Sequence, residues 1–196
     1  MQNQKILILN FGGQYDQLIA RRVRECNVYC EVKPYTMTLS EIQAFDPIGI
    51  IFTGGPDSVY KENSYHPAEG IFELGIPILG ICYGCQLLAY HLGGMVTAAE
   101  NENAKKKKKT LTFYDNSCLL FDGLNEESIS WMSHGDYMRK VPDGFRLVAR
   151  SGKCPNVAIC DENRKYYGVQ FHPEVNHTEN GTAMIRNFLY KVCGAM

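Results

Sequence analysis

A buried strand, a glycine-flanked cysteine and a helix follow one another near the middle of the chain, and this order constrains the fold more than any other stretch. The apolar run at residues 76–81 predicts a short buried strand. The apolar pattern that begins at Tyr83 predicts a helix. Cys82 therefore stands on a tight turn between the two elements, and Gly80 and Gly84 let neighbouring backbone come close to it.

This position suggests a chemical role for Cys82. A side chain on a strand-to-helix turn projects away from the backbone, as in the nucleophile elbow of hydrolases, here with Cys in place of Ser. The free N–H groups at the start of the helix favour an anion, either a thiolate or the oxyanion of a reacting carbonyl. Two plainer interpretations stay open. Cysteines are often buried, and Cys82 with Cys85 could form a redox pair or half of a metal site.

The first half of the chain alternates between predicted strands and predicted helices. Strands are predicted at residues 5–11, 29–34, 48–53 and 76–81, and helices at residues 15–25, 40–45 and 66–75. Such alternation is typical of right-handed crossovers that build a mostly parallel central sheet flanked by helices. Arg21, Arg22 and Arg24 fall on the outward side of the first helix, where we expect a solvated face or a partner contact.

The second half predicts a different kind of sheet. Short alternating segments lie at residues 111–114, 128–132, 145–150 and 157–160, with turn signals between them. A late strand at residues 165–171 and a closing helix at residues 182–192 follow. The expected fold class is therefore α/β, with a mixed or antiparallel extension of the parallel sheet.

Length and composition favour one globular domain over residues 1–196, with 45% hydrophobic residues and a formal net charge of −1. Since no apolar run approaches ~18 residues, we expect no membrane partner. The lysine run at residues 105–109 is expected to be mobile and solvated, and without interleaved aromatic residues it predicts no nucleic-acid partner. Eight cysteines and the absence of a signal peptide favour a reducing cytoplasm with free thiols.

The late strand leads into His172-Pro173-Glu174. Residues i and i+2 of an extended segment project to the same side, and Pro173 restricts His172 to extended geometry. We therefore expect the Glu174 carboxylate to orient the His172 imidazole. Four other histidines compete for the role of base, namely His66, His91, His134 and His177, but none of them has this arrangement.

A cysteine, a histidine and a carboxylate are the parts of a thiol acyl-transfer site. Cys82 would attack a carbonyl, His172 would move the proton, and Glu174 would hold the imidazole tautomer. The glycine pair at residues 54–55 follows a predicted strand, so the backbone N–H groups of Gly55 and Tyr83 would receive the oxyanion. The residues by themselves leave a thiol protease or an esterase open.

Three motifs in this order resemble the class I, or triad, glutamine amidotransferases. They are Gly-Ile-Cys-Tyr-Gly-Cys-Gln at residues 80–86, Thr-Gly-Gly-Pro at residues 53–56 and Gln-Phe-His-Pro-Glu at residues 170–174. The resemblance covers nearly the whole chain and implies the triad Cys82, His172 and Glu174. It also implies that the amino-acid end of glutamine is held by Gln86, Ser133, His134 and Gly135.

Two further stretches resemble the amidotransferase domains of GMP synthetases in particular. They are Phe-Gly-Gly-Gln-Tyr at residues 11–15 and Trp-Met-Ser-His-Gly-Asp at residues 131–136. This resemblance implies that ammonia from glutamine serves a synthetase partner, an ATP pyrophosphatase that converts XMP to GMP with ATP and magnesium. No cofactor or metal is expected in the glutaminase part. Because the chain lacks the synthetase's Ser-Gly-Gly-x-Asp-Ser loop, we expect a separate subunit or a piece of a longer protein, with weak glutaminase activity on its own.

The chain departs from the family pattern at two places. Cys85 stands where relatives usually carry Met or His, and we expect it to pack as a small hydrophobe, with a Cys82–Cys85 disulfide as a hypothesis. Residues 102–105 replace an Arg-Glu-aromatic-Gly stretch, which puts closure of the glutamine pocket in doubt. Three rival functions stay open: the glutaminase of another synthesis (anthranilate, carbamoyl phosphate or CTP), a γ-glutamyl peptidase, and a non-catalytic module.

Overall fold

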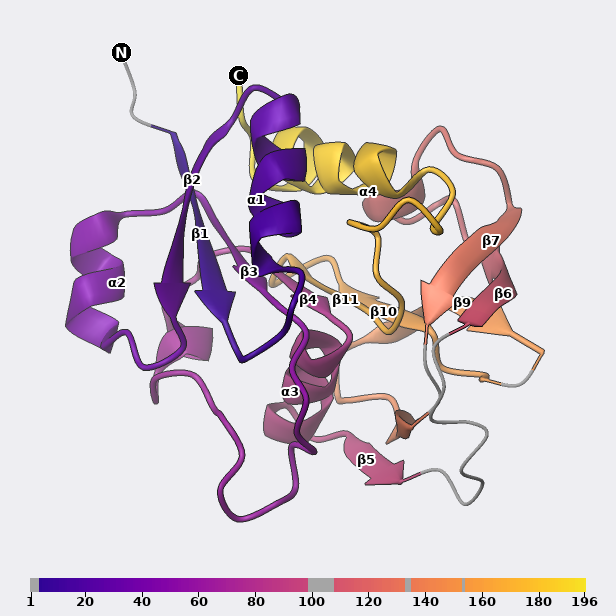
Figure 1. The fold of residues 1–196 in the computed structure, drawn as a ribbon, viewed down its shortest axis with the longest axis horizontal. Coiled ribbons are helices and arrows are strands. Elements are labelled where there is room, and N and C mark those ends of the chain that lie inside the picture. The colour runs from indigo at the N-terminus through magenta and orange to yellow at the C-terminus, as the bar shows by residue number, and fades with distance from the viewer. Residues whose placement is uncertain (1–3, 99–107, 133–134, 153) are drawn as a thin grey trace.

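The computed structural model describes residues 4–98, 108–132, 135–152 and 154–196 (Figure 1). Within these residues a nine-stranded sheet has the order β2-β1-β3-β4-β11-β10-β9-β6-β7. Its parallel part consists of β2 (Tyr29–Pro34), β1 (Lys5–Asn10), β3 (Gly49–Phe52), β4 (Ile78–Ile81) and β11 (Tyr166–Val169). Its antiparallel part consists of β10 (Ala158–Asp161), β9 (Arg146–Ser151), β6 (Lys108–Tyr114) and β7 (Glu127–Met132). The expected α/β class, with an antiparallel extension, is confirmed.

Helices cover both faces of the parallel part. On one face lie α1 (Asp16–Glu25) and α4 (Gly181–Asn187), which continues as a π-helical turn at Phe188–Val192. On the other face lie α2 (Leu39–Phe45) and α3 (Tyr83–His91). Strand β1 packs against the helices of both faces. Ile6 and Ile8 pack beneath α1 and α4, and Leu7 and Leu9 pack beneath α2 and α3. Burial on both faces explains why the central strands are continuous apolar runs.

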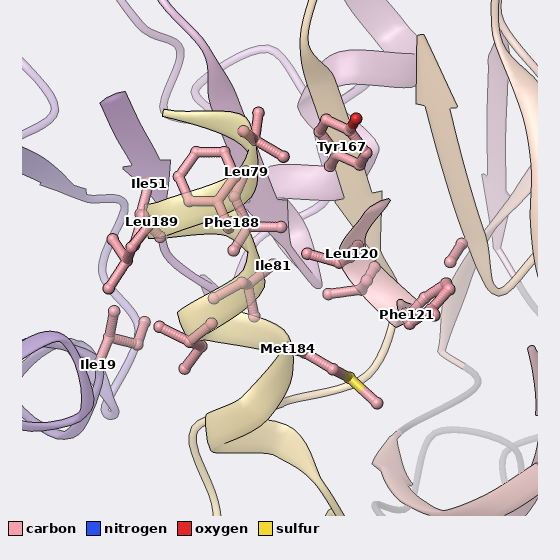
Figure 2. Close-up of a cluster of buried hydrophobic side chains, with 14 of the residues drawn as sticks. Ile19, Ile51, Leu79, Ile81, Leu120, Phe121, Tyr167, Met184, Phe188 and Leu189 are labelled. Atoms are coloured by element: carbon pink, nitrogen blue, oxygen red, sulfur yellow. The ribbon is translucent and has the colours of Figure 1, made fainter. Parts of the chain in front are cut away.

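Figure 2 shows the cluster on the α1 and α4 side. Ile51, Leu79 and Ile81 of the central strands meet Met184, Phe188 and Leu189 of the C-terminal helical segment, and all six are buried. This packing holds the last helix against β3 and β4. The long segment between β11 and α4, which contains His172 and Glu174, is thereby tied down at both ends.

The start of α2 is held by a capping box. The Thr38 hydroxyl accepts from the Glu41 backbone N–H at 3.2 Å, and the Glu41 carboxylate accepts from the Thr38 N–H at 3.0 Å. The predicted helix at residues 66–75 is wrong. Only a 3₁₀ turn forms there, at Ile71–Glu73, because Gly70 (φ 92°) and Gly75 (φ 72°) take left-handed backbone conformations that end a helix.

Two features of the second half differ from the expectations. The last two lysines of the run, Lys108 and Lys109, begin strand β6 and pair with Met132 and Trp131, so they are ordered. Residues 99–107, including the rest of the run and the altered stretch at 102–105, lie outside the described residues. A separate two-stranded sheet, β5 (Met95–Ala98) with β8 (Asp136–Lys140), was not predicted. Among the described residues, no helix is long and apolar enough to cross a membrane.

Candidate active site

Cys82 joins β4 to α3 in an unusual backbone conformation, with φ 55° and ψ −104°. Its backbone N–H donates to the Val169 carbonyl at 2.7 Å, which fixes the turn to β11. The two neighbouring glycines are required by space. A Cβ on Gly84 would lie 2.6 Å from the Phe52 carbonyl oxygen, and one on Gly80 would lie 2.4 Å from the Gly84 oxygen. The turn is therefore the elbow that the sequence predicts.

His172 and Glu174 lie side by side, as expected of an i, i+2 pair. The His172 Nδ1 and the Glu174 Oε2 are 3.1 Å apart, and both side chains are buried. The His172 backbone N–H donates to the Trp131 carbonyl at 2.9 Å, which ties the histidine to β7 of the antiparallel part of the sheet. The His172 Nε2 and the Glu174 Oε1 are buried without a hydrogen-bond partner among the described residues. A buried imidazole nitrogen of this kind is available to a reacting group.

Burial alone would lower the pKa of the His172 imidazole. The charge of Cys82 and the hydrogen-bonded Glu174 carboxylate outweigh that effect and raise the pKa to about 10. The raised pKa favours the protonated imidazole, and a protonated imidazole beside the Cys82 sulfur is the partner that a thiolate nucleophile needs.

The glycine loop after β3 faces the elbow. A Cβ on Gly54 would lie 3.8 Å from the Cys82 Cβ and 3.2 Å from the His172 Cε1. A Cβ on Gly55 would come within 3.2 Å of the Tyr83 ring. Tyr83 occupies the first turn of α3, where backbone N–H groups have no acceptor within the helix. The structure thus brings Gly55 and Tyr83 to the same side of the site as Cys82.

Two cavities adjoin Cys82. The first, of about 450 Å³, is lined by Gly12, Gly13, Gln14, Tyr15, Gly54, Gly55, Pro56, Cys82, His172 and Glu174. The second, of about 480 Å³, is lined by Gly55, Pro56, Asp57, Ser58, Tyr60, Lys61, Cys82, Gln86, Ala98, Gly135 and Asp136. Predicted residues Gln86 and Gly135 therefore share a cavity with the elbow. Ser133 and His134 lie outside the described residues.

Asp136 is a candidate site residue that belongs to the motif at residues 131–136 but has no role predicted from the sequence. Its carboxylate accepts hydrogen bonds from the Ser58 hydroxyl and, at 2.9 Å, from the Tyr60 hydroxyl. Its carbonyl accepts from the Gln86 side chain at 3.2 Å. The sequence signal for this residue was an acidic side chain directly after the Ser-His-Gly stretch. Its contact with Ser58 depends on strand β8, which was not predicted.

Two further side chains touch the site without having been predicted to do so. The buried Gln170 amide donates to the Cys82 sulfur at 3.8 Å. The second is Arg22, and the expectation that it faces solvent is wrong. Its Nε donates to the Glu174 carbonyl at 3.0 Å, and only 15% of its side chain is exposed.

Cys85 is buried and packs under β11, where a Cβ on Gly168 would lie 2.8 Å from its sulfur. Burial raises the pKa of the Cys85 thiol, which makes it a poor nucleophile. Both Cys82 and Cys85 are free thiols in the structure, and their disulfide stays a hypothesis. In the described part of the chain, no group of three or more His, Cys, Asp or Glu side chains could hold a metal ion.

The competing histidines are engaged elsewhere or not described. The His66 Nδ1 and the His91 Nε2 are 2.8 Å apart, and the His177 ring packs on Trp131 with centroids 4.6 Å apart. His134 lies outside the described residues. His172 is therefore the described histidine that lines a cavity with Cys82.

Comparison with known sequences gives a family match and close relatives. The model of the family "Glutamine amidotransferase class-I" matches residues 7–192. A GMP synthase [glutamine-hydrolyzing] of Clostridium botulinum (strain Alaska E43 / Type E3) is 52% identical over 194 residues, which is 99% of this chain and 37% of that protein. The enzyme of the same name from Caldicellulosiruptor saccharolyticus is 53% identical with the same coverage. The chain thus spans little more than a third of the length of these relatives.

Two solved structures share the fold. A candidate GMP synthase subunit from Thermoplasma acidophilum is 31% identical, with a TM-score of 0.84 over 98% of this chain and 95% of that one. A glutamine amidotransferase from Thermotoga maritima is 19% identical, with a TM-score of 0.74 over the full length of both chains. The second likeness concerns the fold alone.

Proposed function

Because the chain belongs to the class-I glutamine amidotransferase family, we propose that it hydrolyses glutamine to glutamate and ammonia with Cys82, His172 and Glu174 as its catalytic triad. One observation supports this most directly. His172 is bonded to a buried carboxylate, its pKa is raised by Cys82, and it lines a cavity with the elbow. An acyl transfer needs a histidine that is oriented by a carboxylate and lies beside the nucleophile, and His172 meets these requirements.

The first half of the reaction forms a thioester. The Cys82 thiolate attacks the carboxamide carbon of glutamine, and the carbonyl electrons move onto oxygen. The backbone N–H groups of Gly55 and Tyr83 stabilise that oxyanion. As the oxyanion collapses, the C–N bond breaks and the His172 imidazolium gives its proton to the leaving nitrogen, which departs as ammonia.

The second half regenerates the enzyme. Neutral His172 takes a proton from water, and the resulting hydroxide adds to the thioester carbon. Collapse of this second oxyanion breaks the C–S bond, releasing glutamate and the thiolate, with the proton left on His172. Throughout, Glu174 keeps the Nδ1 proton in place, so that Nε2 is the nitrogen that transfers protons.

The cavity beside Gln86 is the proposed site for the amino-acid end of glutamine. It has room for a small molecule and contains the Asp136 carboxylate, which is suited to an ammonium group. The Gln86 amide and the predicted stretch at residues 133–135 would take the carboxylate of the substrate. The scissile amide would then lie over Cys82, which lines the same cavity.

We further propose that the ammonia serves GMP formation. The support is the name shared by the relatives at 52–53% identity and the structural likeness to a candidate GMP synthase subunit. A synthetase partner would use ATP and magnesium to activate XMP, so the chain itself needs neither. The measurement that checks this assignment is GMP formation by the whole protein or complex. Ammonia should support GMP formation whether or not Cys82 is intact, whereas glutamine should support it only when Cys82 is intact.

The test of the glutaminase site is labelling with a chloroketone analogue of glutamine. We expect one alkylated residue, Cys82, located by peptide mass spectrometry, and we expect excess glutamine to protect it. C82A should not be labelled. C193A is the matched control, since Cys193 is also partly exposed but lies away from the cavities, and it should be labelled like the wild type. Labelling at another cysteine, or hydrolysis of γ-glutamyl peptides with glutamine untouched, would contradict the proposal.

A further inference from the structure

We propose that Arg22 is a positioning residue for the reaction, because it fixes the backbone of Glu174 and thereby the carboxylate that orients His172. The inference rests on the proposed role of Glu174. It assigns to α1, which was expected to carry only a solvated arginine face or a partner contact, a direct link to the catalytic centre.

The Arg22 guanidinium joins two points of the segment that follows His172. Its Nε donates to the Glu174 backbone carbonyl at 3.0 Å, and its Nη2 donates to the Asn176 side-chain oxygen at 3.0 Å. Its Nη1 pairs with Glu25 of the same helix at 2.8 Å, which holds the guanidinium in place from the other side. A planar fork can make these contacts at once, whereas an ammonium group cannot.

The same segment is also held at its two ends, and Pro173 packs closely against Gly181 at the start of α4. At one end, the His172 N–H bonds the Trp131 carbonyl of β7. At the other, the Thr178 hydroxyl accepts from the Trp131 N–H at 2.9 Å. Between them lies Glu174, whose backbone carbonyl is reached by Arg22 of α1.

The Glu174 carboxylate depends on this backbone anchor. One oxygen bonds His172, and the other is buried without a partner in the part of the chain that the structure describes. Since His172 is itself the group to be oriented, the position of the carboxylate is set by where the backbone of Glu174 is held. Loss of the Arg22 contact would let that backbone shift and weaken the bond to Nδ1.

The experiment compares R22Q and R22K with R21Q, a control on the same helix at an exposed position. We expect R22Q to lower kcat for glutamine about 10- to 100-fold while KM changes less than about twofold, because Arg22 lines neither cavity. R22K should retain an intermediate kcat, since lysine can keep one of the two contacts. R21Q should match the wild type.

A second readout separates positioning from simple destabilisation. The rate of Cys82 alkylation by iodoacetamide, followed by peptide mapping, is measured against pH. We expect R22Q to move the acidic limb of this profile to higher pH, because a poorly held carboxylate stabilises the imidazolium less and the imidazolium then favours the thiolate less. A lower thermal unfolding midpoint with the acidic limb in place, and a kcat reduced only by the unfolded fraction, would overturn the proposal.

The outcomes also distinguish this inference from the proposed function. If R22Q and R21Q have the same kcat and the same acidic limb as an active wild type, the role of Arg22 is wrong and the glutaminase proposal stands. If the wild type does not hydrolyse glutamine, the glutaminase proposal fails. In that case, movement of the acidic limb of alkylation in R22Q would still support the positioning of His172 by Arg22, and an unmoved limb would overturn it.

Discussion

Cys82 holds a backbone conformation that residues with a Cβ rarely adopt, with a positive φ of 55°. Such a conformation costs about 1–3 kcal/mol and persists only where its surroundings enforce it. Here the enforcement comes from the hydrogen bond to Val169 and from the close contact of Gly84 with β3. The benefit is that the sulfur stands between two cavities and beside His172.

The charge of His172 gives a prediction that does not require turnover. Its pKa is raised from 6.5 to about 10, with Cys82 the main cause of the increase. In C82A we expect the titration midpoint of the His172 ring, followed by NMR, to fall well below that of the wild type. E174Q should also lower it, since the carboxylate stabilises the imidazolium.

The same shift has a consequence for stability. A pKa raised on folding means that the charged imidazole stabilises the fold fully below pH 6.5, and that this contribution is lost as the pH rises through about 10. A wild-type His172 that titrates near 6.5, unchanged in C82A, would contradict the ion-pair arrangement.

At the scale of elements, the site depends on how closely α3 approaches β3. The first turn of α3 packs directly on the end of that strand, because Gly84 has no side chain to separate them. This contact places the elbow opposite the glycine loop that follows β3. The element that positions Cys82 and the element that offers Gly55 are thus one packed unit.

Replacing Gly84 tests that unit. A Cβ in G84A would lie 2.6 Å from both the carbonyl oxygen and the Cβ of Phe52, so α3 must move away from β3. We expect the free energy of unfolding, measured by urea denaturation, to fall by about 1–3 kcal/mol. Glutaminase activity should fall more than the folded fraction explains, since the elbow moves with the helix.

Gly152 provides the matched control for this substitution. A Cβ there meets nothing within 4 Å among the described residues, so G152A should leave stability within about 0.5 kcal/mol of the wild type. Equal stability of G84A and G152A would show that α3 is not held at this distance by the absent side chain.

At the scale of the whole molecule, the site is assembled at the edge where parallel strands end. The loop at residues 12–15 follows β1, the loop at 53–56 follows β3, Cys82 follows β4 and His172 lies just beyond β11. This is where ligands bind in open α/β sheets. The cavity formed by these segments opens to the surface beside the partly exposed Cys82, whereas His172 and Glu174 are buried.

That openness predicts that a synthetase partner raises the glutaminase rate. We expect weak turnover by the chain alone. The rate should increase about 5- to 150-fold, the usual range for coupling between sites, when the part of a 52% identical GMP synthase that this chain does not match is added with XMP and ATP. Steady-state glutamate release measures it. The same region without nucleotide is the control, and full-rate turnover by the isolated chain would contradict the prediction.

Much of the fold followed from the sequence. The alternation of buried strands and helices predicted the parallel sheet, and the placing of His172 beside Glu174 followed from extended geometry two residues apart. The helix predicted at residues 66–75 was wrong because the left-handed backbone at Gly70 ends a helix. Strands β5 and β8 were not predicted because their alternating pattern is weak. Because β8 was not predicted, the contacts of Asp136 with Ser58 and Gln86 could not be predicted from the sequence.

By itself, the sequence determined the elbow at Cys82 and the pairing of His172 with Glu174, because turn chemistry and strand periodicity act between near neighbours in the chain. Only the tertiary structure decided that Arg22 reaches the Glu174 backbone across 152 positions, and that Ser58 meets Asp136 across 78. Those contacts arise from the packing of whole elements against one sheet. No local pattern encodes them, since the two partners of each contact lie far apart in the chain.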